Sequence, residues 1–203
     1  MNKLNLFVFG ALASTVMLAS CGGTSEPVAE VVPVAPVTVE IDTAASAVKW
    51  SGTMVGVYSH EGTLKLNSGS YTAIGDSITA GSFVVNLATI VPTDANYDDK
   101  ERTPANLVGH LSSADFFDVA NFPTASFEVT GVNAEGKVTG NLTVRGVTNA
   151  EVLESVAIDT AAGTATAALT FDRQKYGVAW ASTMKDMVLS NDIVLSVTLK
   201  AKG

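Results

Sequence analysis

Apolar and polar residues alternate with a period of two along most of the chain after residue 37. Val48 and Trp50, for example, fall on one face of such a run and Lys49 falls on the other. The same alternation recurs at residues 64–66, 83–88, 127–130, 138–145, 167–172 and 193–200. Because successive side chains of a β-strand point to opposite faces, the pattern predicts antiparallel strands with one buried face and one wet face.

Clusters of Gly, Asn, Ser and Asp interrupt the alternation and are typical of turns between strands. They occur at residues 67–70, 75–76, 133–136 and 162–163. The runs and turns together predict about eight or nine strands, many of them long. Long strands leave exposed edges in an open sheet, and a closed barrel removes those edges. The expected fold class is therefore all-β, as a closed antiparallel barrel or a sandwich.

One segment, residues 92–122, lacks the alternation. Thr103 and Pro104 are typical of the first residues of a helix, and Pro123 stops the segment. We expect a short helical insertion near residues 103–119. A long insertion between strands is where a lid or portal of a barrel is built.

The first twenty residues have the pattern of a secretory signal. Lys3 supplies a positive charge, and an apolar run follows from Leu4 to Ala19, shorter than the roughly 20 residues that a membrane-spanning helix needs. The run ends at Leu18-Ala19-Ser20-Cys21, which resembles the lipobox of bacterial lipoproteins. We therefore expect residues 1–20 to be a cleaved signal peptide and Cys21 to carry a lipid that anchors the chain in a membrane.

A tether is expected between the lipidated residue and the folded part. Residues 21–36 are rich in Pro, Gly, Val and Glu and have no usable periodicity, as in a semi-extended, solvated linker. The globular domain is then expected over residues 37–203. Many lipoproteins retained in the inner membrane have Asp where this chain has Gly22, so we expect a cell-envelope location at the outer membrane, facing the periplasm.

Composition and charge exclude several classes of function. The formal net charge is −8, and the 12 Lys and Arg residues are scattered, so the chain lacks the basic patch of a nucleic-acid-binding protein. Cys21 is the single cysteine, so a lipidated chain keeps no thiol for a disulfide, a metal or nucleophilic catalysis. Ser-His-Asp order, a phosphate loop and metal-ligand spacing are also absent. We expect neither an enzyme nor a catalytic cofactor nor a metal site.

Four motifs, in order, resemble the YceI family. Val48–Gly52 with His60–Gly62 lies where the family has its first hairpin. The run from His110 to Asp118 (HLSSADFFD) continues with Phe122–Phe127 (FPTASF) and resembles the most extended signature. Gly140–Thr148 (GNLTVRGVT) and Asp172–Val178 (DRQKYGV) resemble the next two. The resemblance covers residues 39 to 200, nearly the whole expected domain.

The resemblance implies a lipocalin-like, eight-stranded antiparallel barrel that holds a polyisoprenoid, such as a polyprenol or an isoprenoid quinone tail. A barrel of about eight strands can enclose one slender ligand. By parity, Trp50, Phe83, Phe127 and Phe171 point inward. The full apolar lining that we expect for a ligand consists of Trp50, Phe83, Val85, Leu111, Phe116, Phe117, Phe127, Leu142, Phe171 and Tyr176, with His110 at a polar portal.

Several of these residues have a second interpretation. His110 is either a portal residue or a structural residue that hydrogen-bonds the helix to the barrel, and we favour the structural role. Phe116 and Phe117 either close over a ligand or plug one end of the barrel. His60 is expected at the surface of a hairpin. Asp172-Arg173 is expected to be an ion pair at a strand end.

The family resemblance also has a limit. Many members carry an Arg-Asp pair just before the His-Leu of the first signature, whereas this chain has Val108-Gly109 there. A polar head-group contact from such a pair is therefore not expected here.

Two hypotheses for the function remain. The first is a membrane-anchored carrier or store for an isoprenoid lipid, which requires only apolar burial. The second is an envelope-interaction or stress-response protein whose barrel is filled by its own side chains. An open apolar interior would favour the first, and a filled interior the second.

Overall fold

The computed structural model describes residues 34–203 except 99, 101 and 184–186, and these residues form one compact unit. The expected signal peptide, Cys21 and most of the tether lie outside the described residues. The elements, in chain order, are β1 (Val37–Glu40), β2 (Ala47–Met54), β3 (Tyr58–Ile74), β4 (Ser77–Pro92), α1 (Pro104–Ser112), β5 (Thr124–Val132), β6 (Val138–Val144), β7 (Val147–Val152), β8 (Ser155–Asp159), β9 (Thr164–Asp172), the 3-10 helix η1 (Arg173–Tyr176) and β10 (Leu189–Lys200).

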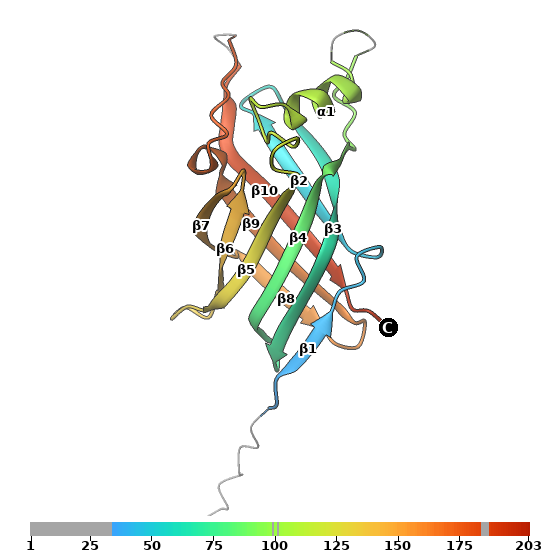
Figure 1. The fold of residues 1–203 in the computed structure, drawn as a ribbon, viewed down its shortest axis with the longest axis vertical. Helices are drawn as coiled ribbons and strands as arrows, with labels where there is room; N and C mark the ends of the chain where they lie inside the picture. The colour runs from blue at the N-terminus through green and yellow to red at the C-terminus, as the bar shows by residue number, and fades with distance from the viewer. Residues whose placement is uncertain (1–33, 99, 101, 184–186) are drawn as a thin grey trace, which may run out of the picture. The chain divides into compact units, whose positions relative to one another are not determined.

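The described strands form one antiparallel sheet in the order β7-β6-β5-β4-β3-β2-β10-β9-β8, with β1 added to β3. The two edge strands, β7 and β8, are consecutive in the chain. Between them the N–H of Leu153 donates to the carbonyl of Val138 in β6, and the N–H of Glu154 donates to the carbonyl of Ala168 in β9. The chain therefore passes from one edge of the sheet to the other at this point, and the sheet curls into a barrel (Figure 1).

Two pairs of short strands act as single interrupted strands. β1 and β2 pair with opposite ends of the long β3, at residues 70–73 and 58–64 respectively. β7 and β8 likewise pair with β6 and β9 in succession. Ten segments thus make about eight strands, and the prediction of an all-β, lipocalin-like antiparallel barrel is confirmed.

The alternation of the sequence is visible as alternating burial. In β6 every second residue is buried, namely Val138, Gly140, Leu142 and Val144, and the residues between them are partly exposed. This is the result expected when one face of a strand lines a core and the other faces water.

The insertion between β4 and β5 contains the expected helix. The hydroxyl of Thr103 caps α1 by accepting a hydrogen bond from the N–H of Asn106 at 3.1 Å, and Pro104 occupies the first turn. The helix ends at Ser112, so it is shorter than the insertion, and turns complete the connection to β5. Figure 1 shows α1 lying at one end of the barrel, with β1 toward the other end.

One predicted turn is wrong. Residues 67–70 lie within β3, where the pairing with β4 shifts register between Leu66 and Ser68. Gly69 is opposite Phe83 in this pairing, and a Cβ at Gly69 would stand 2.8 Å from the Phe83 ring. Glycine is therefore present here because an aromatic ring lies against the backbone, and not because the chain turns.

Candidate functional site

The barrel encloses a cavity of about 320 Å³ whose wall is almost entirely apolar. The volume falls at the lower end of the range of ligand sites, roughly 300–1,000 Å³. The strands contribute most of the wall. The α1 insertion adds Leu107, Val119 and four of the residues singled out in the sequence, His110, Leu111, Phe116 and Phe117.

Nine of the ten apolar residues expected to line a ligand site are in the wall of this cavity: Trp50, Phe83, Val85, Leu111, Phe116, Phe117, Phe127, Leu142 and Phe171. His110 also lines it. Their contact with a ligand stays a prediction, but the expected lining forms one continuous surface.

Tyr176 is the exception, and its placement corrects the expectation. It lies in η1, fully buried, with its ring edge-on to Phe171 at 5.3 Å between centroids. Its hydroxyl donates to Glu151 at 2.8 Å. Burial and this bond raise the pKa of Tyr176, so the hydroxyl stays protonated. The strand alternation ends at Asp172, so it no longer determines which way Tyr176 points.

Three wall aromatics lie against glycines of neighbouring strands. A Cβ at Gly62 would stand 2.5 Å from the Trp50 ring, and a Cβ at Gly140 would stand 2.4 Å from the Phe127 ring. The Phe83 ring has the same relation to Gly69. Each ring therefore lies over backbone that carries no side chain. The rings supply large apolar surfaces to the wall.

Two buried polar atoms belong to residues of this wall and lack a partner in the part of the chain that the structure describes. Trp50 Nε1 and His110 Nε2 are buried and have no hydrogen-bond partner among the described residues. The residues that line the cavity include no Lys, Arg, Asp or Glu. The hydrogen-bonding capacity of the wall therefore comes from groups that are neutral or, for histidine, able to be neutral.

His110 is held by aromatic contacts. Its ring meets Phe116 at 5.0 Å and Trp180 at 4.8 Å between centroids, both edge-to-face. These contacts join α1 to two later segments of the chain. Because Nε2 is unpartnered, the ring packing, and not a hydrogen bond from this nitrogen, fixes His110 against the barrel.

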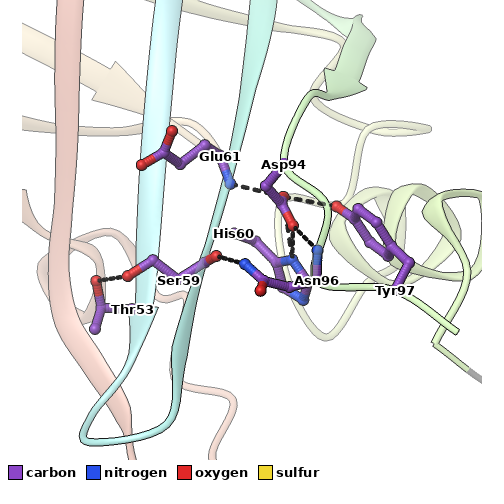
Figure 2. A network of polar contacts seen from close by, with 7 residues as sticks. All are labelled: Thr53, Ser59, His60, Glu61, Asp94, Asn96 and Tyr97. Atoms are coloured by element: carbon purple, nitrogen blue, oxygen red, sulfur yellow. Dashed lines mark hydrogen bonds and ion pairs between the residues drawn. The ribbon is translucent and has the colours of Figure 1, made fainter.

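A polar network ties the loop after β4 to the start of β3 (Figure 2). The carboxylate of Asp94 accepts hydrogen bonds from the N–H groups of Glu61 and Asn96, from the Tyr97 hydroxyl and from His60 Nδ1, at 2.8–3.2 Å. Burial alone would raise the pKa of Asp94, but these four donors lower it to about 2. The loop that precedes α1 is therefore fixed by a carboxylate that is ionised at neutral pH.

His60 is part of this network, which corrects its expected surface position. Its side chain is 18% exposed, its ring stacks on Tyr97 at 5.1 Å, and it lines the cavity together with Tyr58. This contact was not predictable from the residues around His60, because Asp94 is 34 residues away and follows a separate strand.

Arg173 does not form the expected ion pair. Arg173 is 1% exposed, and its guanidinium donates to the carbonyls of Ser190 at 2.9 Å and Val178 at 2.5 Å. The Asp172 carboxylate instead accepts from the N–H of Gln174 at the start of η1. Burial lowers the pKa of Arg173. Its role is to join the segment after β9 to the start of β10.

Two further properties concern membranes and metals. No helix among the described residues is long and apolar enough to cross a bilayer. Within residues 34–203, leaving out the five undescribed positions, no group of three or more His, Cys, Asp or Glu side chains is placed to hold a metal ion.

Comparison with known proteins identifies the family of this barrel. A family model described as a YceI-like domain matches residues 40–201. A protein of Azotobacter vinelandii called UPF0312 protein is 36% identical over 96 residues, which are 45% of this chain and 46% of that protein. The match thus spans about half the length of such curated relatives.

Solved structures share the fold. The crystal structure of BcnA from Burkholderia cenocepacia superposes with a TM-score of 0.57 at 17% identity, over 78% of this chain and 98% of that one. A polyisoprenoid-binding domain from Saccharophagus degradans, implicated in plant cell wall breakdown, gives a TM-score of 0.51 at 13% identity, over 80% of this chain and 98% of that one. The family concerned is one of binding proteins and not of enzymes.

Proposed function

Since this chain belongs to the YceI-like domain family, we propose that its barrel binds an isoprenoid lipid, either a polyprenol or an isoprenoid quinone. The observation that carries the proposal is the continuous apolar cavity inside the barrel. Burial contributes roughly 0.8 kcal/mol per CH₂, so each five-carbon isoprene unit contributes about 4 kcal/mol before the costs of association. A few units are therefore sufficient for stable binding.

The name of the Saccharophagus degradans domain supports the choice of ligand, because that domain is described as polyisoprenoid-binding. The shape of the wall supports it as well. Aromatic rings laid over Gly62 and Gly140 provide flat apolar surfaces, which suit an unsaturated hydrocarbon chain.

We also propose that the protein is anchored in the cell envelope and transports or stores its ligand there. The leader and Cys21 support a lipid anchor, and Gly22 favours the outer membrane, with the barrel in the periplasm. Isoprenoid lipids dissolve in the bilayer. A barrel attached to the membrane would therefore lie close to the source of its ligand.

The alternative is an envelope-interaction or stress-response protein with a filled barrel. It requires side chains to occupy the interior. A cavity of about 320 Å³ weighs against it.

Mass spectrometry of an organic extract tests the proposal. Protein purified from a Gram-negative host is expected to release about one equivalent of an isoprenoid. Ala167 lines the cavity, so Ala167→Phe places a ring in the ligand's volume and is expected to reduce the recovered lipid at least fivefold. The matched control is Ala150→Phe, at an exposed position of β7, which is expected to retain the lipid.

The same experiment has a clear negative result. An empty wild-type extract, still empty after incubation with polyprenols and quinones, would contradict lipid binding. Equal recovery from both variants would show that the lipid is held outside the cavity.

A further inference from the structure

The two ends of β3 differ in the residues that they expose. The turn that joins β2 to β3 is Val55-Gly56-Val57, and its two valines are 55% and 54% exposed. The other end of β3 is Ile74, which is followed by the turn Gly75-Asp76 with a charged residue. Valines exposed at the tip of a hairpin add little to the core, so the first turn is a candidate contact surface for another molecule.

A third exposed valine lies beside the β2–β3 turn. Val188 is 61% exposed, and its carbonyl accepts a hydrogen bond from the N–H of Val55 at 2.8 Å. The N–H of Val57 donates to the carbonyl of Met54 at 3.0 Å. We call Val55, Val57 and Val188 the valine tip. Because the N–H groups of both turn valines already have acceptors, neither would be left unpaired in an apolar medium.

The surroundings of the valine tip are uncharged in the sequence. Residues 51–60 and 187–190 contain no Asp, Glu, Lys or Arg, whereas the whole chain has a net charge of −8. That net charge disfavours docking on an anionic surface. An apolar tip without charges of its own is instead suited to a zwitterionic bilayer, into which apolar side chains can be buried.

The valine tip borders the end of the barrel where the cavity wall is partly exposed. Met54, Tyr58 and Leu189 are the chain neighbours of the three valines, and all of them line the cavity and are partly exposed. At the opposite end, the wall residues Ile78 and Leu199 are buried, each at 5%. These exposures favour entry of a ligand beside the valine tip.

The expected tether allows the tip to reach a membrane. β1 pairs with β3 toward the end of the barrel opposite the β2–β3 turn (Figure 1). At about 3.3 Å per residue, about 43 Å of strand separates Tyr58 from Tyr71, which is paired with β1. Residues 21–36 span at most about 53–58 Å when extended. A chain anchored at Cys21, as proposed above, can therefore turn this end of the barrel onto its own bilayer.

We infer that the valine tip is a docking surface for a lipid bilayer. Val55, Val57 and Val188 enter the interface of a zwitterionic membrane and hold the mouth of the barrel against it, so that lipid passes directly between the bilayer and the cavity. The inference rests on the proposed function for the identity of the cargo. Docking itself is a property of the surface and is measurable on a bilayer without cargo.

A fluorescent label at the tip measures docking. The chain from Gly22 to Gly203 keeps the compact unit of residues 34–203 but lacks the leader and the single cysteine, so Val57→Cys provides one site for an environment-sensitive nitrobenzoxadiazole dye. On phosphatidylcholine vesicles without isoprenoid, its emission is expected to rise by about twofold or more, and nitroxide-labelled lipids are expected to quench it. The matched control is Ile74→Cys, at a position that is 43% exposed, which is expected to give neither response.

Charged variants test whether docking is the route of transfer. Val57→Asp places a carboxylate where burial without a cation is strongly unfavourable, and is expected to slow uptake of geranylgeraniol from phosphatidylcholine vesicles by about tenfold or more. Ile74→Asp is expected to keep the wild-type rate. Mass spectrometry of the protein, after the vesicles are removed by centrifugation, measures the uptake. Geranylgeraniol added from ethanol without vesicles is expected to load both variants to the wild-type level, which shows that the cavity is intact.

The outcomes distinguish docking from the proposed function. Equal emission changes at residues 57 and 74, or no change at residue 57, would refute the docking surface. Uptake from vesicles that is as fast in Val57→Asp as in the wild type would refute direct transfer. Self-association that Val57→Asp abolishes, without any response to vesicles, would instead assign the tip to a second copy of the chain. If residue 57 responds to vesicles but the wild type takes up no geranylgeraniol by either route, docking stands and the proposed cargo is contradicted.

Discussion

Replacing Gly140 by alanine tests how the cavity wall is built. Gly140 lies in β6, and a Cβ there would stand 2.4 Å from Cζ of Phe127 and 2.6 Å from the carbonyl oxygen of Glu128. Favourable contacts between carbon atoms need about 3.5–4.0 Å. The Phe127 ring can shift toward the cavity, but the Glu128 carbonyl belongs to the β5 backbone, so the strands themselves must move.

The loss of stability expected for Gly140→Ala is the difference between two opposing effects. Overpacking of this kind costs about 1–3 kcal/mol, and the loss of glycine's freedom in the unfolded chain offsets about 0.4–1 kcal/mol of it. The net destabilisation is about 1–2 kcal/mol. With a urea slope of about 2 kcal/mol per molar, the unfolding midpoint falls by roughly 0.5–1 M.

The control is Gly109→Ala, at an exposed position of α1 where a Cβ meets no atom within 4 Å. It is expected to raise the stability by about 0.5–1 kcal/mol through helix propensity. Urea unfolding followed by circular dichroism measures both variants. A Gly140→Ala midpoint at or above that of the wild type would refute this description of the wall.

Three further predictions concern residues outside the wall. Arg173→Met leaves the carbonyls of two segments without their buried donor. It is expected to lower the free energy of unfolding, measured in urea, by about 2–5 kcal/mol. A decrease below about 1 kcal/mol would contradict the role given to Arg173. Asp94 has a folded-state pKa of about 2, below its ordinary 3.8, so its stabilisation is complete above about pH 4 and is lost as the pH falls through 2. Asp94→Asn is therefore expected to have a lower Tm than the wild type at pH 7, with the difference shrinking between pH 4 and pH 2, and a pH-independent difference would disagree. Cys21→Ser is expected to move the protein from the membrane to the soluble fraction, and unchanged membrane association would exclude a lipid anchor at this residue.

The cavity wall was predictable because a period of two fixes the face of every residue in a strand. Once the runs around Trp50, Phe127 and Phe171 were assigned to strands, their inward direction followed. The prediction failed where the period ended. Tyr176 lies four residues beyond Asp172, the last residue of β9, in a 3-10 helix with its own geometry, so its ring packs against Phe171 and not in the wall.

Contacts between distant segments were not predictable from one sequence. Asp94 meets His60 because the end of β4 returns beside the start of β3, and that depends on strand register. Gly69 is a second contact of this kind. The composition of residues 67–70 indicated a turn, but glycine is needed there because Phe83 lies opposite on the neighbouring strand. Such pairs become visible only when the pairing of the strands is known.

The central claim is that the barrel interior holds an isoprenoid chain. An experimental electron-density map of the protein, purified without added lipid, tests it most directly. The claim predicts continuous, elongated density within the cavity that Trp50, Phe127 and Phe171 help to line. Side chains that repack to fill the cavity, or an interior with no such density even after incubation with isoprenoid lipids, would contradict it.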